Sequence, residues 1–155
     1  MKTLKCIWVG RLKSRFWSEA AAHYLGLLGR WYTVREVVVR DAPAGSPAER
    51  TRAEGAAILA TLGPADLPIC LDERGEVHTS RELATLLQGW VLDGNRSPCF
   101  IVGGAYGLSE TVRGACKRAL SLSAMTLPHE MARVVLLEQL YRAGSILRGL
   151  PYHHD

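Results

Sequence analysis

The sequence predicts an α/β protein whose mainly parallel sheet is covered by helices on both faces. Apolar, strand-like runs alternate along the chain with segments that carry a helical apolar period over roughly ten to fifteen residues. This alternation is typical of βαβ units, in which a helix leads from one parallel strand to the next. The strand-like runs are apolar along nearly their whole length, as expected for a sheet that is buried on both faces.

Four strands are expected from runs of apolar or β-branched residues that are bounded by turn signals. They comprise residues 4–9, 34–39, 67–72 and 97–102. The first run ends at Gly10, and the second ends in a loop, 41–47, that contains two prolines and a glycine. Residues 73–76, which follow the third run, predict a turn.

Helices are expected where the apolar residues recur with a 3.6-residue period and where capping residues precede them. They run from Ser14 to Leu28, over 48–62, from Thr79 to Trp90, from about Ser109, and over 128–148. Thr79 and Glu82 have the spacing of a capping box, and Pro128 suits the first turn of the last helix. Helix 128–148 is apolar around so much of its circumference that we expect a dimer interface to cover it.

Length and composition fit a soluble globular protein. The 155 residues suit one domain, expected over residues 1–155, and the 48% hydrophobic and 22% charged residues exclude a disordered or collagen-like chain. The formal net charge of +4 permits a polyanionic partner such as RNA without identifying one.

The cysteine pattern and the N-terminus bear on the cellular compartment. The four cysteines form no C-x-x-C pair and no Cys/His grouping with zinc spacing, so no metal site is expected. Cys6, Cys70 and Cys99 lie in apolar strand-like runs, where free cysteines usually serve as small buried hydrophobes. The N-terminal apolar stretch is too short for a signal peptide, and no run approaches the roughly 18 apolar residues of a membrane span. These features predict a cytoplasmic protein with reduced cysteines and no membrane partner.

Ligands of open α/β sheets bind beyond the carboxyl ends of the strands. Three segments occupy such positions: Leu71-Asp72, Gly103-Gly104-Ala105-Tyr106-Gly107 and residues 122–127. The glycines fit neither the G-x-G-x-x-G dinucleotide motif nor a Walker loop, so they indicate either a ligand loop or only a tight turn. The small, uncharged residues 122–127 fit either a fifth buried strand or a loop whose backbone faces a ligand.

Polar residues mark the last helix and the C-terminus. His129, Arg133 and Arg142 interrupt the apolar helix 128–148, and the chain ends in Pro151-Tyr152-His153-His154-Asp155. Because terminal residues are often frayed, this ending is either a solvated tail or a group of side chains held over a neighbouring site.

Four ordered motifs in the C-terminal half resemble those of one known family. They are Gly103-Gly104-x-x-Gly107-Leu108-Ser109, Leu122-Ser123-x-Met125-Thr126-Leu127-Pro128-His129, Glu138-Gln139-Leu140-Tyr141-Arg142-Ala143 and Pro151-Tyr152-His153. With the total length and the Leu71-Asp72 strand end, they resemble the RlmH family, small ribosomal RNA methyltransferases of the SPOUT class once called YbeA-like. The resemblance spans the whole chain.

The resemblance implies that S-adenosyl-L-methionine binds in a deep trefoil knot of the C-terminal half of an obligate homodimer. It implies methylation of N3 of a pseudouridine in large-subunit (23S) ribosomal RNA within the assembled 70S ribosome. Carried over by position, the residues that would enclose the cofactor are Leu71, Gly103, Gly104, Leu122, Ser123, Ala124, Met125, Thr126 and Leu127.

The implied reaction assigns roles to four polar side chains. N3 of pseudouridine is an imide nitrogen that must lose its proton, so the reaction requires a base or a cation that stabilises the anion. His129 and His153 are candidate bases because imidazole titrates near neutrality. Arg142 would steady the developing negative charge or orient RNA, and Tyr152 would stack on or hydrogen-bond the target base. The resemblance also implies that the tail of one subunit completes the cofactor site of the other.

The sequence departs from the family pattern at two places. His154 and Asp155 stand where the family often carries a cation, and Ala105-Tyr106 replaces residues such as Pro-Glu in the glycine loop. Neither change removes a group that the resemblance assigns to catalysis.

Two other functions stay open on the sequence. A non-catalytic dimer that binds adenosylmethionine or a nucleotide fits the composition and strand order equally well, although it has no need of Tyr152 and His153 over a methyl donor. A nicotinamide-dependent enzyme is disfavoured because the dinucleotide motif and a clearly placed acidic residue are missing.

Overall fold

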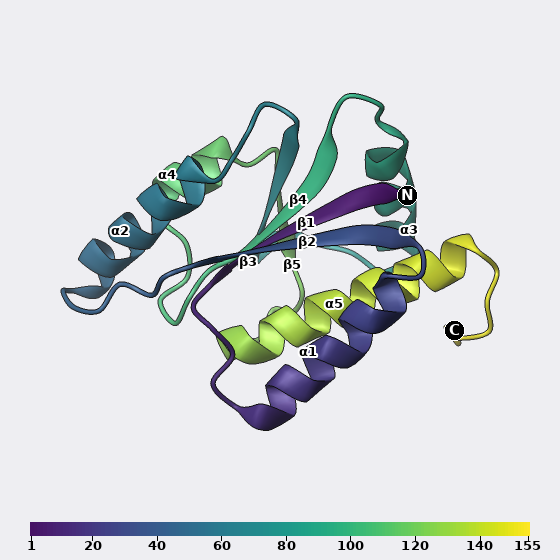
Figure 1. Cartoon of the computed structure of the whole chain (residues 1–155), viewed down its shortest axis with the longest axis horizontal. Helices are drawn as coiled ribbons and strands as arrows, with labels where there is room; N and C mark the ends of the chain where they lie inside the picture. The colour runs from purple at the N-terminus through teal and green to yellow at the C-terminus, as the bar shows by residue number, and fades with distance from the viewer.

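The computed structural model describes residues 1–155 as one five-stranded sheet with five helices. The strands are β1 (Lys2–Val9), β2 (Tyr32–Val39), β3 (Asp66–Val77), β4 (Ser97–Val102) and β5 (Arg118–Ser121). The helices are α1 (Arg15–Leu28), α2 (Pro47–Ala60), α3 (Ser80–Leu92), α4 (Glu110–Ala115) and α5 (His129–Leu147). All neighbouring strands pair in parallel in the order β2-β1-β4-β3-β5 (Figure 1), which confirms the predicted fold class.

Helices cover both faces of the sheet, as predicted. α2 and α4 lie on one face, and α1, α3 and α5 cover the other (Figure 1). The larger core, beneath α1, α3 and α5, contains Trp8, Phe100 and Leu140, whereas the smaller core contains Ile58 and Val112. Successive side chains of β4 enter the two cores in turn, which explains why this strand is apolar along its length.

Capping side chains set where several helices begin. Thr79 forms the predicted capping box: its Oγ1 accepts the Glu82 N–H at 3.2 Å, and its own N–H donates to Glu82 Oε2 at 2.7 Å. Ser109 caps α4 through its side-chain oxygen, but Ser14 makes no side-chain bond at the start of α1. Pro128 lies at the N-cap of α5, so the helix begins at His129, one residue later than expected.

The fifth strand differs in position from the one that the sequence allowed. Residues 118–121 form β5, and residues 122–128 form the connection from β5 into α5. The alternative of a buried strand over 122–127 is therefore wrong, and the loop alternative is correct.

The turn predicted over 73–76 is also wrong. These residues continue β3 through a bulge, in which both Leu71 and Glu76 pair with Leu120 of β5. A β-carbon on Gly75 would lie 2.6 Å from the backbone carbonyl of Ala119, so the close approach of the two strands requires glycine.

Helix α5 is buried largely by its own chain. Leu136, Leu137 and Leu140 are fully buried where α5 packs against the sheet, α1 and α3. We expected a dimer interface because one neighbouring element cannot cover so much apolar surface, but three elements share the task. The apolar circumference of α5 therefore does not by itself indicate a partner.

The cysteines behave as expected from the sequence. All four are free, and Cys6, Cys70 and Cys99 are buried. Burial raises the pKa of the Cys99 thiol to about 12, so this thiol stays protonated and unreactive. Separately, none of the helices combines the length and the apolar character needed to cross a membrane.

Substitution of Leu137 tests the packing of α5. Leu137→Ala should lower the free energy of unfolding by about 2–5 kcal/mol, because it leaves a cavity in the larger core. Urea denaturation at one fixed protein concentration measures the loss. Leu92 is 70% exposed at the end of α3, so Leu92→Ala is the matched control and should change stability by less than about 0.5 kcal/mol. Equal losses in the two variants would contradict this assignment of the core.

Candidate functional site

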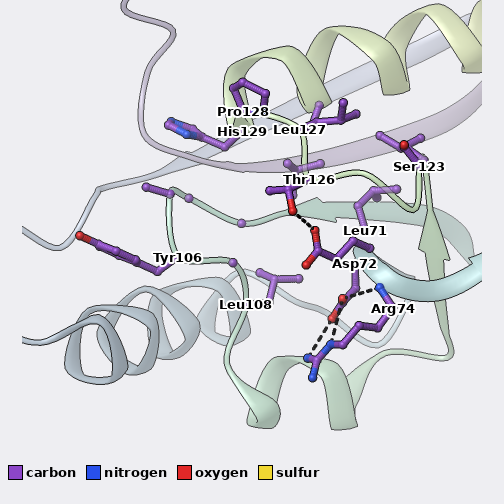
Figure 2. Close-up of a pocket in the computed structure, with 18 of the residues that line it drawn as sticks. Leu71, Asp72, Arg74, Tyr106, Leu108, Ser123, Thr126, Leu127, Pro128 and His129 are labelled. Atoms are coloured by element: carbon purple, nitrogen blue, oxygen red, sulfur yellow. Dashed lines mark hydrogen bonds and ion pairs between the residues drawn. The ribbon is translucent and has the colours of Figure 1, made fainter.

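A cavity of about 850 Å³ lies at the carboxyl ends of β4 and β5, beside the bulge of β3 (Figure 2). Three segments form its walls: the bulge of β3 (71–74), the glycine loop (103–108) and the entry loop into α5 (122–128). The parallel sheet brings these segments together because the carboxyl ends of all its strands meet at one edge. The cavity therefore lies at the edge of the sheet where the sequence predicts a ligand site.

Most of the residues that the resemblance assigns to a cofactor line this cavity. The lining includes Leu71, Gly103, Gly104, Leu122, Ser123, Met125, Thr126 and Leu127. Ala124 is exposed and is absent from the lining. Ser123 Oγ accepts the Met125 N–H at 2.9 Å, and this local bond places Ala124 at the tip of the entry loop.

The glycine loop is both a tight turn and a wall of the cavity. The Gly107 N–H donates to the Gly104 carbonyl at 3.0 Å, and Gly107 adopts a φ of +78°, which glycine alone tolerates readily. A β-carbon on Gly103 would lie 2.7 Å from the Gly107 carbonyl carbon. The two sequence interpretations of this loop are therefore compatible.

An ion-pair network fixes the floor of the cavity (Figure 2). The Asp72 carboxylate accepts the Arg74 N–H at 2.9 Å and also accepts hydrogen bonds from the Arg74 and Arg113 guanidinium groups. Burial of Asp72 would raise the pKa of its carboxyl group, but these donors outweigh burial and lower that pKa to about 2. Asp72 therefore stays ionised and ties the bulge of β3 to α4.

A second bond joins two walls of the cavity. Thr126 Oγ1 donates to Glu73 Oε2 at 2.6 Å, which connects the entry loop to the bulge of β3. Leu108 and Tyr106 also line the cavity, from the glycine loop. The sequence patterns do not predict that Arg113 pairs with Asp72 or that Leu108 lines the cavity. Arg113 lies within α4, and Leu108 lies at the far end of the glycine loop.

The first turn of α5 holds the end of β1 in place. Arg133, only 4% exposed, donates from Nη2 to the Gly10 carbonyl at 2.8 Å and lies over the Trp8 ring at 5.0 Å. Glu130 Oε1 accepts the N–H groups of Lys13 at 2.6 Å and Ser14 at 3.3 Å. These contacts fix the start of α5, and with it His129, which lines the cavity.

The predicted tail residues form a separate cluster on the second half of α5. Glu138 Oε1 accepts hydrogen bonds from Arg142 Nη2 at 2.6 Å and from the Tyr152 hydroxyl at 3.0 Å. Burial and the Glu138 carboxylate raise the pKa of Tyr152, so its phenol stays protonated. Arg142 Nη1 lies 3.1 Å from His153 Nδ1, and His153 Nε2 lies 3.2 Å from Asp155 Oδ1. Since arginine can only donate, His153 Nδ1 accepts here and Nε2 carries the proton.

The tail cluster lies far from the cavity of its own chain. About 20 Å of helix axis separate His129 from Arg142. In Figure 1 the C-terminus follows the opposite end of α5 from the entry loop. One chain thus brings His129 to the cavity, but it does not bring Arg142, Tyr152 or His153 there.

The cavity lining offers backbone groups and leucine side chains, and the structure contains no grouping of three or more His, Cys, Asp or Glu that could hold a metal ion. Exposed main chain at strand ends can bind the edge of a base, whereas the fixed ion pairs of the floor hold the walls in position. The site is therefore suited to binding and positioning a small molecule.

Comparison with known proteins identifies the family. A family model described as "Predicted SPOUT methyltransferase" matches residues 1–153. Two relatives named ribosomal RNA large subunit methyltransferase H are 53% identical (Oleidesulfovibrio alaskensis) and 54% identical (Nitratidesulfovibrio vulgaris strain Miyazaki F). Both alignments cover 99% of this chain and 100% of the relative.

A solved structure shows the same fold at low identity. The probable methyltransferase from Bordetella pertussis is 18% identical and has a TM-score of 0.61, over 90% of this chain and 93% of that one. The sequence motifs, the match of the family model to residues 1–153 and the full-length relatives all indicate the same family. The chain belongs to the RlmH family of SPOUT methyltransferases.

Proposed function

We propose that the protein is an S-adenosylmethionine-dependent methyltransferase that methylates N3 of a pseudouridine in the 23S RNA of the assembled ribosome. Residues 1–155 would act as one methyltransferase domain in a cytoplasmic homodimer. The cavity at the carboxyl edge carries this proposal, because backbone-rich loops surround it at the positions that the family resemblance assigns to the cofactor. The name of the relatives, ribosomal RNA large subunit methyltransferase H, supports the RNA substrate.

The cavity fits S-adenosylmethionine in size and in chemistry. Its volume of about 850 Å³ lies within the roughly 300–1,000 Å³ that small-molecule sites occupy. Leu71, Leu108 and Leu122 provide apolar walls suited to an adenine ring, and the backbone of the glycine and entry loops provides donors and acceptors. The cofactor, when bound, supplies an electrophilic methyl group on a sulfonium, so the protein need not provide a nucleophile.

The remaining tasks of the protein are positioning and removal of the N3 proton. His129 is the imidazole that lines the cavity of its own chain and is a candidate base. His153 Nδ1 accepts from Arg142 and Nε2 carries the proton toward Asp155, so His153 can accept a proton only after Arg142 releases Nδ1. Arg142 would stabilise the N3 anion, and the protonated Tyr152 would donate a hydrogen bond to the target base or stack on it.

We further propose that the tail acts on the cavity of the partner subunit. The axial separation of about 20 Å between His129 and Arg142 is too great for a side chain to bridge, and α5 is a continuous helix. A second copy that presents its tail near the cavity would supply the missing groups. This arrangement gives the homodimer a chemical role.

The path of the chain around the cavity is consistent with a knot. β5 is the edge strand beside β3, whereas α5 packs between α1 and α3 beneath the central strands. The entry loop must therefore return across the carboxyl ends of β3 and β4. We propose that it does so by threading through the preceding segment as a trefoil.

Methyl transfer to ribosomal RNA tests the function directly. The protein is incubated with radiolabelled S-adenosylmethionine and with 70S ribosomes, separated subunits or free 23S RNA from cells that lack it. We expect label at N3 of one pseudouridine, strongest on assembled ribosomes, because a small chain of net charge +4 needs a preformed RNA surface. Measurable cofactor binding without label on any RNA would instead favour the non-catalytic binding dimer.

Removal of the tail separates catalysis from cofactor binding. A chain without residues 152–155 should lose about 100-fold or more in methyl transfer and keep its cofactor affinity, because the cavity lies elsewhere in the chain. Transfer kinetics and calorimetric titration measure the two effects. His154→Ala is the matched control, because it alters an exposed tail residue to which we assign no role. Normal transfer by the shortened chain would exclude a role for Tyr152 and His153.

Mixed dimers test whether the tail acts across the interface. Ala105→Trp should fill the cavity mouth and abolish cofactor binding, which titration verifies first. Neither this variant nor the chain without 152–155 should be active alone. If the tail acts across the interface, mixing and re-equilibrating them should restore activity, since one site then combines an intact cavity with an intact tail. Inactive mixed dimers, with subunit exchange verified, would assign the tail to its own chain.

A further inference from the structure

An aromatic ring that the proposed reaction does not use lies at the mouth of the cavity. Tyr106 is 54% exposed and lines the cavity from the glycine loop. Figure 2 shows its ring projecting outward, on the same side as His129 and away from Ser123. Its ring is therefore accessible to a partner that approaches from solvent.

The loop holds the backbone that carries this ring in a fixed position. The bond of 3.0 Å from the Gly107 N–H to the Gly104 carbonyl closes a four-residue turn, in which Tyr106 is the third residue. Gly107 has positive φ, and the contact between Gly103 and the Gly107 backbone leaves no space for a β-carbon. A partner that binds the ring therefore need not order the backbone of the loop.

A cation lies against the same ring. The Arg50 guanidinium carbon, from the first turns of α2, lies 5.8 Å from the Tyr106 ring centroid. Arg50 Nε also donates to the Gly45 carbonyl at 3.1 Å, which anchors the side chain without neutralising its charge. The mouth of the cavity thus presents a flat aromatic face beside a positive charge.

We propose that Tyr106, supported by Arg50, stacks on an unpaired base of 23S RNA next to the target nucleotide and so positions the RNA over the cavity. This inference rests on the proposed function and adds a residue that binds the substrate. Unpaired RNA bases are recognised by stacking on aromatic rings and on arginine planes. A base that leaves its stack to enter a cavity also leaves its neighbours unstacked, so a replacement stacking surface at the mouth lowers that cost.

The charge at the mouth favours RNA over the cofactor as the partner of this ring. S-adenosylmethionine carries a positive sulfonium, which the nearby Arg50 repels, whereas the phosphates that flank an RNA base are attracted to it. The exposed position of Tyr106 fits a large partner that approaches from solvent. A ring that stacked on the cofactor would be expected deeper in the cavity, beside Leu71 or Leu122.

Steady-state kinetics on ribosomes with Tyr106 variants test the proposal. Tyr106→Ala should raise KM for ribosomes about ten-fold, because stacking on one base is lost. The kcat and the cofactor affinity should stay close to those of the unmodified protein. Tyr106→Phe keeps the ring and should restore normal KM, whereas Tyr106→Leu keeps bulk without an aromatic face and should not. A purely structural role would instead lower the melting temperature and would not separate Phe from Leu.

Variants of α2 provide the control for charge. Arg50→Gln should raise KM for ribosomes and reduce its dependence on salt, while Arg52→Gln removes the same charge from an exposed residue without an aromatic neighbour and should have little effect. An unchanged KM in Tyr106→Ala would overturn the proposal, and so would weaker cofactor binding with unchanged KM for ribosomes. If the unmodified protein transferred no methyl group to any RNA, the proposed function would fail and this inference would fail with it.

Discussion

The parallel direction of all five strands is the constraint on which the site depends. Because every strand points the same way, the loops that follow β1, β3, β4 and β5 meet at one edge of the sheet. α5 then locks that edge, since Arg133 donates to the carbonyls of Val9 and Gly10, and Glu130 accepts two backbone N–H groups of the loop after β1. The helix that begins at the cavity therefore also fixes the end of β1, an interior strand of the sheet.

The sequence predicts most of the fold because most of its signals are local. The capping box at Thr79 and the apolar run 97–102 each specify an element through neighbouring residues alone. β5 has only four residues and begins with Arg118, too short and too polar for a periodic pattern. The bulge near Gly75 depends on the approach of β5, so a turn was the simpler prediction from Gly75 and its polar neighbours.

The site is predictable only where it follows from topology. The carboxyl-edge rule and the motifs locate the glycine loop and the entry loop, which do line the cavity. The pairing of Asp72 with Arg113 joins residues 41 positions apart and leaves no local signal. The separation of Arg142 from the cavity depends on the straight, uninterrupted course of α5, which a list of motifs does not convey.

A sulfonium cofactor and a polyanionic substrate make opposite electrostatic demands on one small site. At the floor of the cavity, Asp72 and Glu110 together compensate the charges of Arg74 and Arg113, and a pKa of about 2 keeps Asp72 ionised at neutral pH. The cations suited to RNA lie elsewhere: Arg50 at the mouth, and Arg142 on the far half of α5 in contact with Glu138. In the proposed dimer, Arg142 would reach the reaction only from the partner subunit. The guanidinium groups that line the cavity are thus held in ion pairs, and in the proposed dimer the cation that would stabilise the N3 anion arrives on a separate structural element.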